Sequence, residues 1–227
     1  MADYTPTVRS YKMTVASGFA PNAYGGTLTL ATCKPGIMAC AKIGEWIAGF
    51  TSKAMNGDEV GQERLIYLMQ VQQIMSIPEY WDSFPQKRPN VNTLGDNIYC
   101  LPDQAQAEGF SYFPIKVGNN PFGFVRVEPV YHHPEPLRMA VDIALNRILV
   151  SKMYRYFGQD NPLNLDYPIR QLLRIPTGQH PYGYITTGEQ AQIFISYVMN
   201  IDTIQLENNV YVSAENDHTF TKKPKIC

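Results

Sequence analysis

The stretch from Thr27 to Phe50, TLTLATCKPGIMACAKIGEWIAGF, decides the fold that we expect for this chain. Its β-branched beginning, Thr27–Thr32, predicts a strand, and Pro35 suits the first turn of a short helix. Gly44-Glu45 forms a turn that leads into a second, apolar strand at Trp46–Phe50. Strands on both sides of a short helix predict a domain that combines a sheet with helices outside it.

A third strand is predicted after a polar loop, at Arg64–Met75. We expect its central part, Leu65–Val71, to share one sheet with the strands at Thr27–Thr32 and Trp46–Phe50. Strands are clustered along the chain, and strands and helices do not alternate regularly. That order argues against a doubly wound sheet. The predicted class is α+β, with a mixed, strongly curved or barrel-like sheet and peripheral helices.

The length of the chain, 227 residues, fits one large domain or two small ones. Pro85–Asn120 is the best candidate for a domain boundary, but a long loop within one domain fits equally well. We predict a single domain over residues 1–227. A helix at Thr187–Asn200 and a polar tail after Asn208 complete it.

Two internal helices are predicted from local patterns. Ser76 and Glu79 form a capping pair three residues apart, which predicts the start of a helix. Further along, Leu137, Val141 and Leu145 recur at helical spacing. They predict a second helix at Pro134–Arg147.

The charge of the chain limits its partners. Its 19 basic and 20 acidic residues give a net charge of −1, whereas proteins that grip duplex DNA by its phosphates are usually basic. We therefore expect weak or no binding to random duplex DNA, and recognition of a nucleotide or of a flipped or modified DNA base. No apolar stretch approaches the ~20 residues that span a bilayer, and the N-terminus lacks a signal-peptide core. The expected location is the cytoplasm, without a membrane partner.

Several common catalytic and metal-binding motifs are absent from the sequence. The four cysteines form no Cys-x-x-Cys pair, and adjacent histidines at His132-His133 would point to opposite faces of a strand. There is no Walker A loop, no Gly-x-Ser-x-Gly elbow, no His-Glu-x-x-His and no zinc-deaminase signature. We expect no cofactor and no metal ion.

The first candidate site is the Gly- and Pro-rich loop Gly18–Pro35. The amide of Asn22 offers both a donor and an acceptor for a base edge. Lys34 precedes a helix start and is a candidate for holding a phosphate, and Cys33 is a candidate nucleophile at the same place. The alternative is a tight connection that contains a small buried cysteine.

Two further candidate sites contain polar side chains beside glycines. Asp96 and Asn97 follow a glycine and are candidates for binding a ribose or a base, with a plain turn as the alternative. Tyr156 offers a stacking face, and His180, next to Gln179, offers a general acid/base or a donor to a base edge. The alternative there is an aromatic core beside a surface histidine.

The same segments resemble a known family. Three strings look like the N-terminal signature of the nucleotide modification associated domain, type 2: Gly18–Asn22 (GFAPN), Thr29–Pro35 (TLATCKP) and Ile43–Gly49 (IGEWIAG). Shorter strings that fit the family's pattern follow in order: Leu65–Val71, Glu79–Trp81, Gly95–Tyr99, Ile148–Ser151, Tyr156–Gly158 and Gly178–His180. The resemblance covers about residues 11 to 182.

The chain departs from the family's pattern at two places. Met38 stands where family members tend to have a basic residue, and Gly44-Glu45 replaces a usual Gly-Asp. The resemblance implies a place in nucleotide and DNA-base hypermodification in phages and prokaryotes, without specifying a reaction. The order of strands also resembles the PUA-like superfamily of EVE and ASCH domains. Those are small curved barrels that accept a flipped or modified base.

Three functions remain open at this point. The first is a binding module whose pocket lies between the Gly18–Pro35 loop, Trp46 and the Gly178–His180 loop. The second is an enzyme that modifies a nucleotide or a base in DNA, with Cys33, Asp96 and His180 as the catalytic candidates. The third is an interaction protein without a ligand.

Overall fold

The computed structural model describes residues 5–14, 16–89, 95–116, 120–128, 136–178, 180 and 182–201. Its contacts divide the chain into two compact units, each built from separate segments. Among the described residues, unit 1 comprises those within 5–16, 40–72 and 151–201, and unit 2 comprises those within 17–39 and 73–150. The single domain expected from the sequence stays a prediction.

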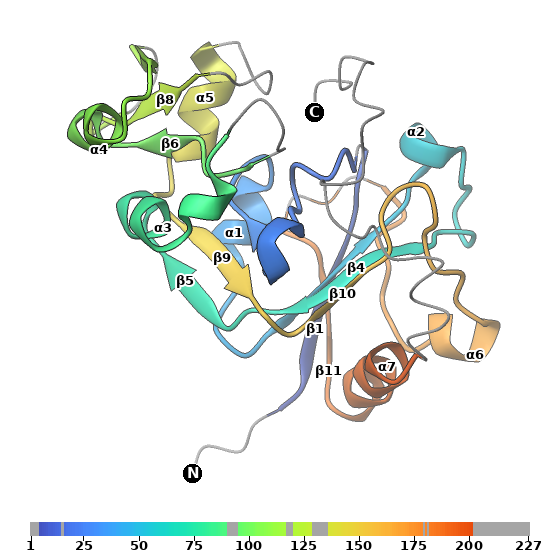
Figure 1. Ribbon diagram of the computed structural model, residues 1–227. Helices are drawn as coiled ribbons and strands as arrows, with labels where there is room; N and C mark the ends of the chain where they lie inside the picture. Colours follow the sequence, from blue (N-terminus) through green and yellow to red (C-terminus); the bar gives the residue numbers. More distant parts are fainter. Residues whose placement is uncertain are drawn as a thin grey trace. The chain divides into compact units, whose positions relative to one another are not determined.

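Unit 1 is built on a five-stranded sheet with the order β10-β4-β3-β1-β11 (Figure 1). The central pair β1 and β3 is parallel, and the other pairs are antiparallel, so the sheet is mixed. The strands are β1 (Thr7–Lys12), β3 (Trp46–Phe50), β4 (Leu65–Gln70), β10 (Tyr154–Tyr156) and β11 (Tyr184–Thr187). The helices of this unit are α2 (Lys53–Asn56), α6 (Tyr167–Arg170) and α7 (Glu189–Met199).

The core of unit 1 lies between this sheet and α7. Helix α7 packs against β1, β10 and β11, and its Phe194 and Val198 are fully buried with Trp46 and Leu68 of the sheet. On β3, Gly49 lies opposite Tyr67, where an added Cβ would come within 2.3 Å of the tyrosine ring. A glycine is therefore required for these two strands to pair at this register.

Unit 2 contains two three-stranded sheets, with the orders β2-β9-β5 and β6-β8-β7. Their strands are β2 (Leu28–Leu30), β5 (Gln73–Met75), β6 (Tyr99–Cys100), β7 (Tyr112–Pro114), β8 (Val125–Val127) and β9 (Ile148–Ser151). The α-helices are α1 (Pro35–Cys40), α3 (Ile77–Ser83), α4 (Pro102–Ala107) and α5 (Pro136–Ile143), and two 3-10 helices are η1 (Tyr24–Gly26) and η2 (Pro85–Lys87). The class is α+β, as the sequence predicts.

The predicted start of α3 is confirmed in atomic detail. The Ser76 hydroxyl accepts a hydrogen bond from the Glu79 amide at 3.4 Å, and the Glu79 carboxylate accepts one from the Ser76 amide at 2.8 Å. This capping box satisfies backbone donors that the first turn leaves open. It directs Tyr80 into the core of unit 2, where its ring is fully buried.

Two predictions about the strands are wrong. β3 and β4 do pair, but Leu28–Leu30 belongs to the sheet of β9 and β5. The predicted long strand Arg64–Met75 is broken after Gln70, and its two parts, β4 and β5, enter different sheets. The described strands form three open sheets, so the barrel-like curvature stays a prediction.

The helix predicted from Leu137, Val141 and Leu145 is present as α5, but its apolar stripe faces outwards. Leu137 is 68% exposed and Val141 is 48% exposed, whereas Met139, Asp142 and Ile143 on another face are buried. Helical spacing alone identified an apolar stripe, but the packing in unit 2 selects the face that carries Asp142. In the part of the chain that the structure describes, no helix is long and apolar enough to cross a membrane.

Candidate functional site

A buried lysine stands at the centre of a polar network in unit 2. Lys87, the last residue of η2, is fully buried, and its ammonium donates to the Asn22 side-chain oxygen at 2.8 Å. It also donates to the Asn22 and Thr27 carbonyls and to the Thr29 hydroxyl, at 3.0–3.1 Å. Burial lowers the pKa of Lys87 to about 8, although the nearby Asp96 opposes this shift. The network ties the Gly18–Pro35 loop to η2.

Asp96 belongs to the same network. Its carboxylate accepts from the Thr29 hydroxyl at 2.6 Å and from the Tyr80 hydroxyl at 2.7 Å. Burial raises the pKa of Asp96, and the Lys87 ammonium opposes the rise. Two of the predicted site residues, Asn22 and Asp96, are thus brought together, but both are 1% exposed and bonded to neighbouring side chains.

Asn97 lies beside Asp96 and serves the end of α3. Its side-chain amide donates to the Tyr80 and Phe84 carbonyls, at 3.1 Å each. These carbonyls lie in the last turn of the helix and just after it, and they also accept from the backbone amides of Phe84 and Lys87, at 3.0 Å each. In this structure the side chain therefore acts as a helix cap, and its role towards a ligand stays a prediction.

Cys33 has an uncommon backbone conformation. Its φ of 66° places it in the left-handed region, which non-glycine residues adopt rarely and often at functional sites. The Cys33 amide donates to the Asp142 carboxylate at 2.9 Å, and the Tyr99 hydroxyl donates to its other oxygen at 3.0 Å. The thiol is partly exposed, and so is the next residue, Lys34. Both lie at the start of α1, as the sequence predicts.

The predicted residues in unit 1 are placed differently from one another. Trp46 is 4% exposed within the hydrophobic core, and Tyr156 is 2% exposed. Burial raises the pKa of Tyr156, and Asp160 adds to this rise. Gln179 lies outside the described residues. His180 remains partly exposed at the start of a turn towards β11.

His180 is one of three groups that meet at Tyr184. The His180 ring contacts the edge of the Tyr184 ring, with the centroids 4.7 Å apart, and the Arg174 guanidinium lies 5.2 Å from the centroid of the same ring. The Nδ1 atom of His180 is buried and has no hydrogen-bond partner among the described residues. A buried polar atom in this state calls for a partner that the described residues do not supply.

Tyr184 also lines a polar pocket of about 390 Å³ in unit 1. The charged residues of its lining are Glu63, Arg170 and Arg174. Glu63 pairs with Arg170 and with Lys12 of β1. The sequence analysis missed these residues because each one lies in a polar segment and carries no motif. The only available signal was the spacing of Arg170 and Arg174 on one turn-rich segment before the Gly178–His180 loop.

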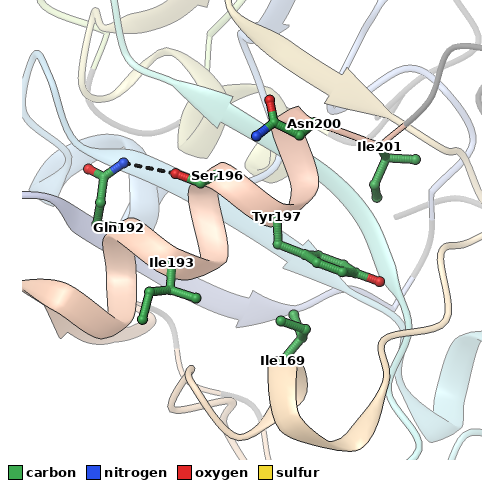
Figure 2. A pocket seen from close by; sticks show the side chains of 7 residues that line it. All are labelled: Ile169, Gln192, Ile193, Ser196, Tyr197, Asn200 and Ile201. Atoms are coloured by element: carbon green, nitrogen blue, oxygen red, sulfur yellow. Dashed lines mark hydrogen bonds between the residues drawn. The ribbon is translucent and has the colours of Figure 1, made fainter.

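A second, larger groove of about 660 Å³ runs along the outer side of α7 (Figure 2). The described residues of its lining are uncharged, and the Gln192 side-chain amide donates to the Ser196 hydroxyl one turn further along α7 at 3.0 Å. The lining residues are Ile169, Gln192, Ile193, Ser196, Tyr197, Asn200 and Ile201. Ile193, on this side of α7, is 44% exposed. Without charged groups, this groove offers nothing that selects a phosphate.

Comparison with known proteins gives one match. The family model described as nucleotide modification associated domain 2 matches residues 5–216. The chain belongs to the nucleotide modification associated domain 2 family. The match extends beyond both ends of the resemblance seen in the sequence and includes the whole pocket at Tyr184. No curated protein and no solved structure matches the chain.

The family is named for its association with nucleotide modification, which fits a role of this chain in that process. Membership leaves the ligand and the reaction open. Among the predicted side chains, Asn22, Asp96 and Asn97 are engaged with unit 2 itself. His180 combines partial exposure, a buried unsatisfied nitrogen and a neighbouring polar pocket-lining residue.

Proposed function

We propose that this member of the nucleotide modification associated domain 2 family binds a nucleotide or a modified base through the pocket at Tyr184. The observation that carries the proposal is the arrangement of Arg174 and His180 around the Tyr184 ring. An aromatic ring with a guanidinium beside it is a surface on which planar bases stack, worth about 1–3 kcal/mol per base.

The unsatisfied nitrogen of His180 supports a polar ligand at this place. Neutral imidazole donates from one ring nitrogen and accepts at the other, so Nδ1 suits either a donor or an acceptor on a base edge. A bound ligand that supplies the missing hydrogen bond would remove a cost of about 1–3 kcal/mol. A ligand that lacks the matching group would bind more weakly by the same free energy. This would give the site selectivity among bases.

The near-neutral chain favours a single nucleotide or an extruded base over a grip on the DNA backbone. The PUA-like relationship, with its curved barrel around a flipped base, is part of this proposal and adds a fold analogy only. Asn22, Lys34 and Asn97 would then act by shaping unit 2.

An enzyme is the second candidate, and Cys33 favours it. The thiol belongs to a residue with a left-handed backbone. The amide of Cys33 donates to the Asp142 carboxylate, which also accepts from the Tyr99 hydroxyl. Such conformations concentrate at functional sites. Asp96 is a weaker catalytic candidate, because its carboxylate is buried and accepts two internal hydrogen bonds.

Equilibrium titration with nucleosides and nucleotides, followed by mass spectrometry of the recovered ligand, tests the proposal. We expect at least one of these compounds to bind and to be recovered unchanged. His180→Ala should weaken binding about tenfold, because one hydrogen bond to a buried group is lost. Tyr167→Leu, at a tyrosine that is 76% exposed in the same unit, serves as the control. Recovery of a chemically altered nucleotide would establish the enzyme instead.

A further inference from the structure

Glu63 is a buried carboxylate that holds two cations. Its side chain is 1% exposed, and Oε1 lies 2.5 Å from the Lys12 ammonium. Oε2 pairs with the Arg170 guanidinium, whose Nε also donates to the Gly61 carbonyl at 2.9 Å. One carboxylate neutralises one of the two cations. The cluster therefore keeps one positive charge in excess.

Arg174 adds a second excess charge to the same pocket. Its side chain is exposed and lies against the Tyr184 ring, and within the described ranges its guanidinium forms no ion pair. Among the described residues of the lining, Glu63 is the one carboxylate, and it is shared between Lys12 and Arg170. The described lining thus keeps an excess of positive charge, and Arg174 carries the part of it that no carboxylate pairs with.

The positive field of the cluster is visible on Lys12. Burial, and then the charge of Arg170, lower the pKa of Lys12 below its ordinary value. Burial is the larger cause, and the smaller one shows that the positive charge of Arg170 acts on Lys12. An anion bound at Arg170 would offset this second cause.

The excess charge matches one class of phosphate better than another. A phosphate monoester carries about −1.5 to −2 charges at pH 7 and presents three acceptor oxygens. A phosphodiester within a strand carries one charge, with two of its oxygens esterified. Guanidinium groups bind phosphate oxygens in pairs, through two parallel N–H donors. Two arginines with two uncompensated charges therefore favour the monoester.

We propose that the pocket lined by Arg170, Arg174 and Glu63, whose carboxylate also pairs with Lys12, binds the phosphate monoester of a nucleoside monophosphate and discriminates against the phosphodiesters of a DNA strand. This inference rests on the proposed nucleotide binding and adds its substrate class. The base then lies towards Tyr184 and His180, and the phosphate lies towards α6. A volume of about 390 Å³ lies within the ~300–1,000 Å³ typical of small-molecule sites.

Calorimetric titration with three matched sets of probes tests the inference. The sets are the four common 2′-deoxynucleoside 5′-monophosphates, their methyl esters, which are phosphodiesters of the same base and sugar, and the four nucleosides. We expect the preferred monophosphate to bind about tenfold or more tightly than its methyl ester and its nucleoside, because charge-assisted hydrogen bonds are lost in both. If the monophosphate, the methyl ester and the nucleoside of the preferred base bind with equal affinity, the monoester site is overturned and the proposed function still stands. Absence of binding by all twelve compounds would overturn both.

Substitutions of the two arginines test whether these residues bind the phosphate. Arg174→Gln should reduce the affinity for the monophosphate about tenfold and change that for the nucleoside less than threefold, since it removes one charged donor pair. Arg170→Gln should act in the same direction, and its fold is checked by its melting temperature because it also pairs with Glu63. Arg138→Gln, at an exposed arginine of α5, is the matched control. A monophosphate preference that survives Arg174→Gln and a folded Arg170→Gln would place the phosphate elsewhere and refute the inference.

Discussion

At the scale of single residues, Lys87 is the side chain on which unit 2 depends most. Its ammonium has four oxygen acceptors and lies near the buried Asp96 carboxylate. We expect Lys87→Met to lower the free energy of unfolding by about 3–5 kcal/mol, because it leaves a buried charge without its partner. Lys53→Met, whose side chain is 74% exposed, should change it by less than about 0.5 kcal/mol. Chemical denaturation of both variants measures this, and a loss below about 1 kcal/mol for Lys87→Met would show that the network is dispensable.

The same lysine predicts a pH dependence. Burial lowers its pKa to about 8, whereas the unfolded chain restores a value near 10.5. Between these values the unfolded chain binds more protons than the folded chain, so the contribution of this group to stability rises with pH. From pH 7 to pH 9 the rise is on the order of 1 kcal/mol. The stability difference between the wild type and Lys87→Met should widen by about this amount at pH 9, and a constant or narrower difference would contradict the lowered pKa.

The burial of Lys87 and Glu63 could not be predicted from the sequence. Lys87 and Glu63 each lie in a segment that is polar on both sides, where a charged residue is normally solvated. Their burial depends on partners far away in the chain: Asn22 for Lys87, and Lys12 and Arg170 for Glu63. Asn22 was identified from its own loop, but its bond to Lys87 has no local signal.

At the scale of elements, Gly95 controls how the segment with Asp96 and Asn97 approaches η2. An added Cβ would lie 2.1 Å from the Lys87 carbonyl oxygen and 2.7 Å from that of Arg88, both in the backbone. We expect Gly95→Ala to destabilise the protein by about 1–3 kcal/mol, because backbone atoms have to shift. Gly178→Ala is the matched control, since an added Cβ there meets nothing within 4 Å. Thermal unfolding compares the two, and equal melting temperatures would refute the close approach.

Elements that depend on neighbouring residues were predictable, and those that depend on distant pairing were less so. The start of α3 follows from Ser76 and Glu79 alone, and the structure confirms it. The partner of β2 depends on β9, more than a hundred residues away, so local alternation could not identify its sheet. The same limit explains α5, where the stripe that begins at Leu137 has helical spacing but faces outwards.

At the scale of the whole molecule, the charge balance predicts how tightly the chain binds duplex DNA. A net charge of −1 gives few phosphate contacts, and each such contact would add about 0.9 to the salt slope of binding to duplex DNA. We expect no nanomolar binding to unmodified duplex at physiological salt. Fluorescence anisotropy with a labelled random duplex at several salt concentrations checks this. Tight binding with a steep salt dependence would require a basic surface that the composition does not suggest.

The central claim is that a nucleotide occupies the pocket at Tyr184, and a crystal structure of the protein soaked with its preferred 2′-deoxynucleoside 5′-monophosphate tests it most directly. We expect density for the phosphate within about 3 Å of the Arg170 or Arg174 guanidinium, with the base against Tyr184 and a polar atom of the base at His180 Nδ1. Density for the nucleotide at the Gly18–Pro35 loop or at Cys33, with the pocket at Tyr184 empty, would contradict it.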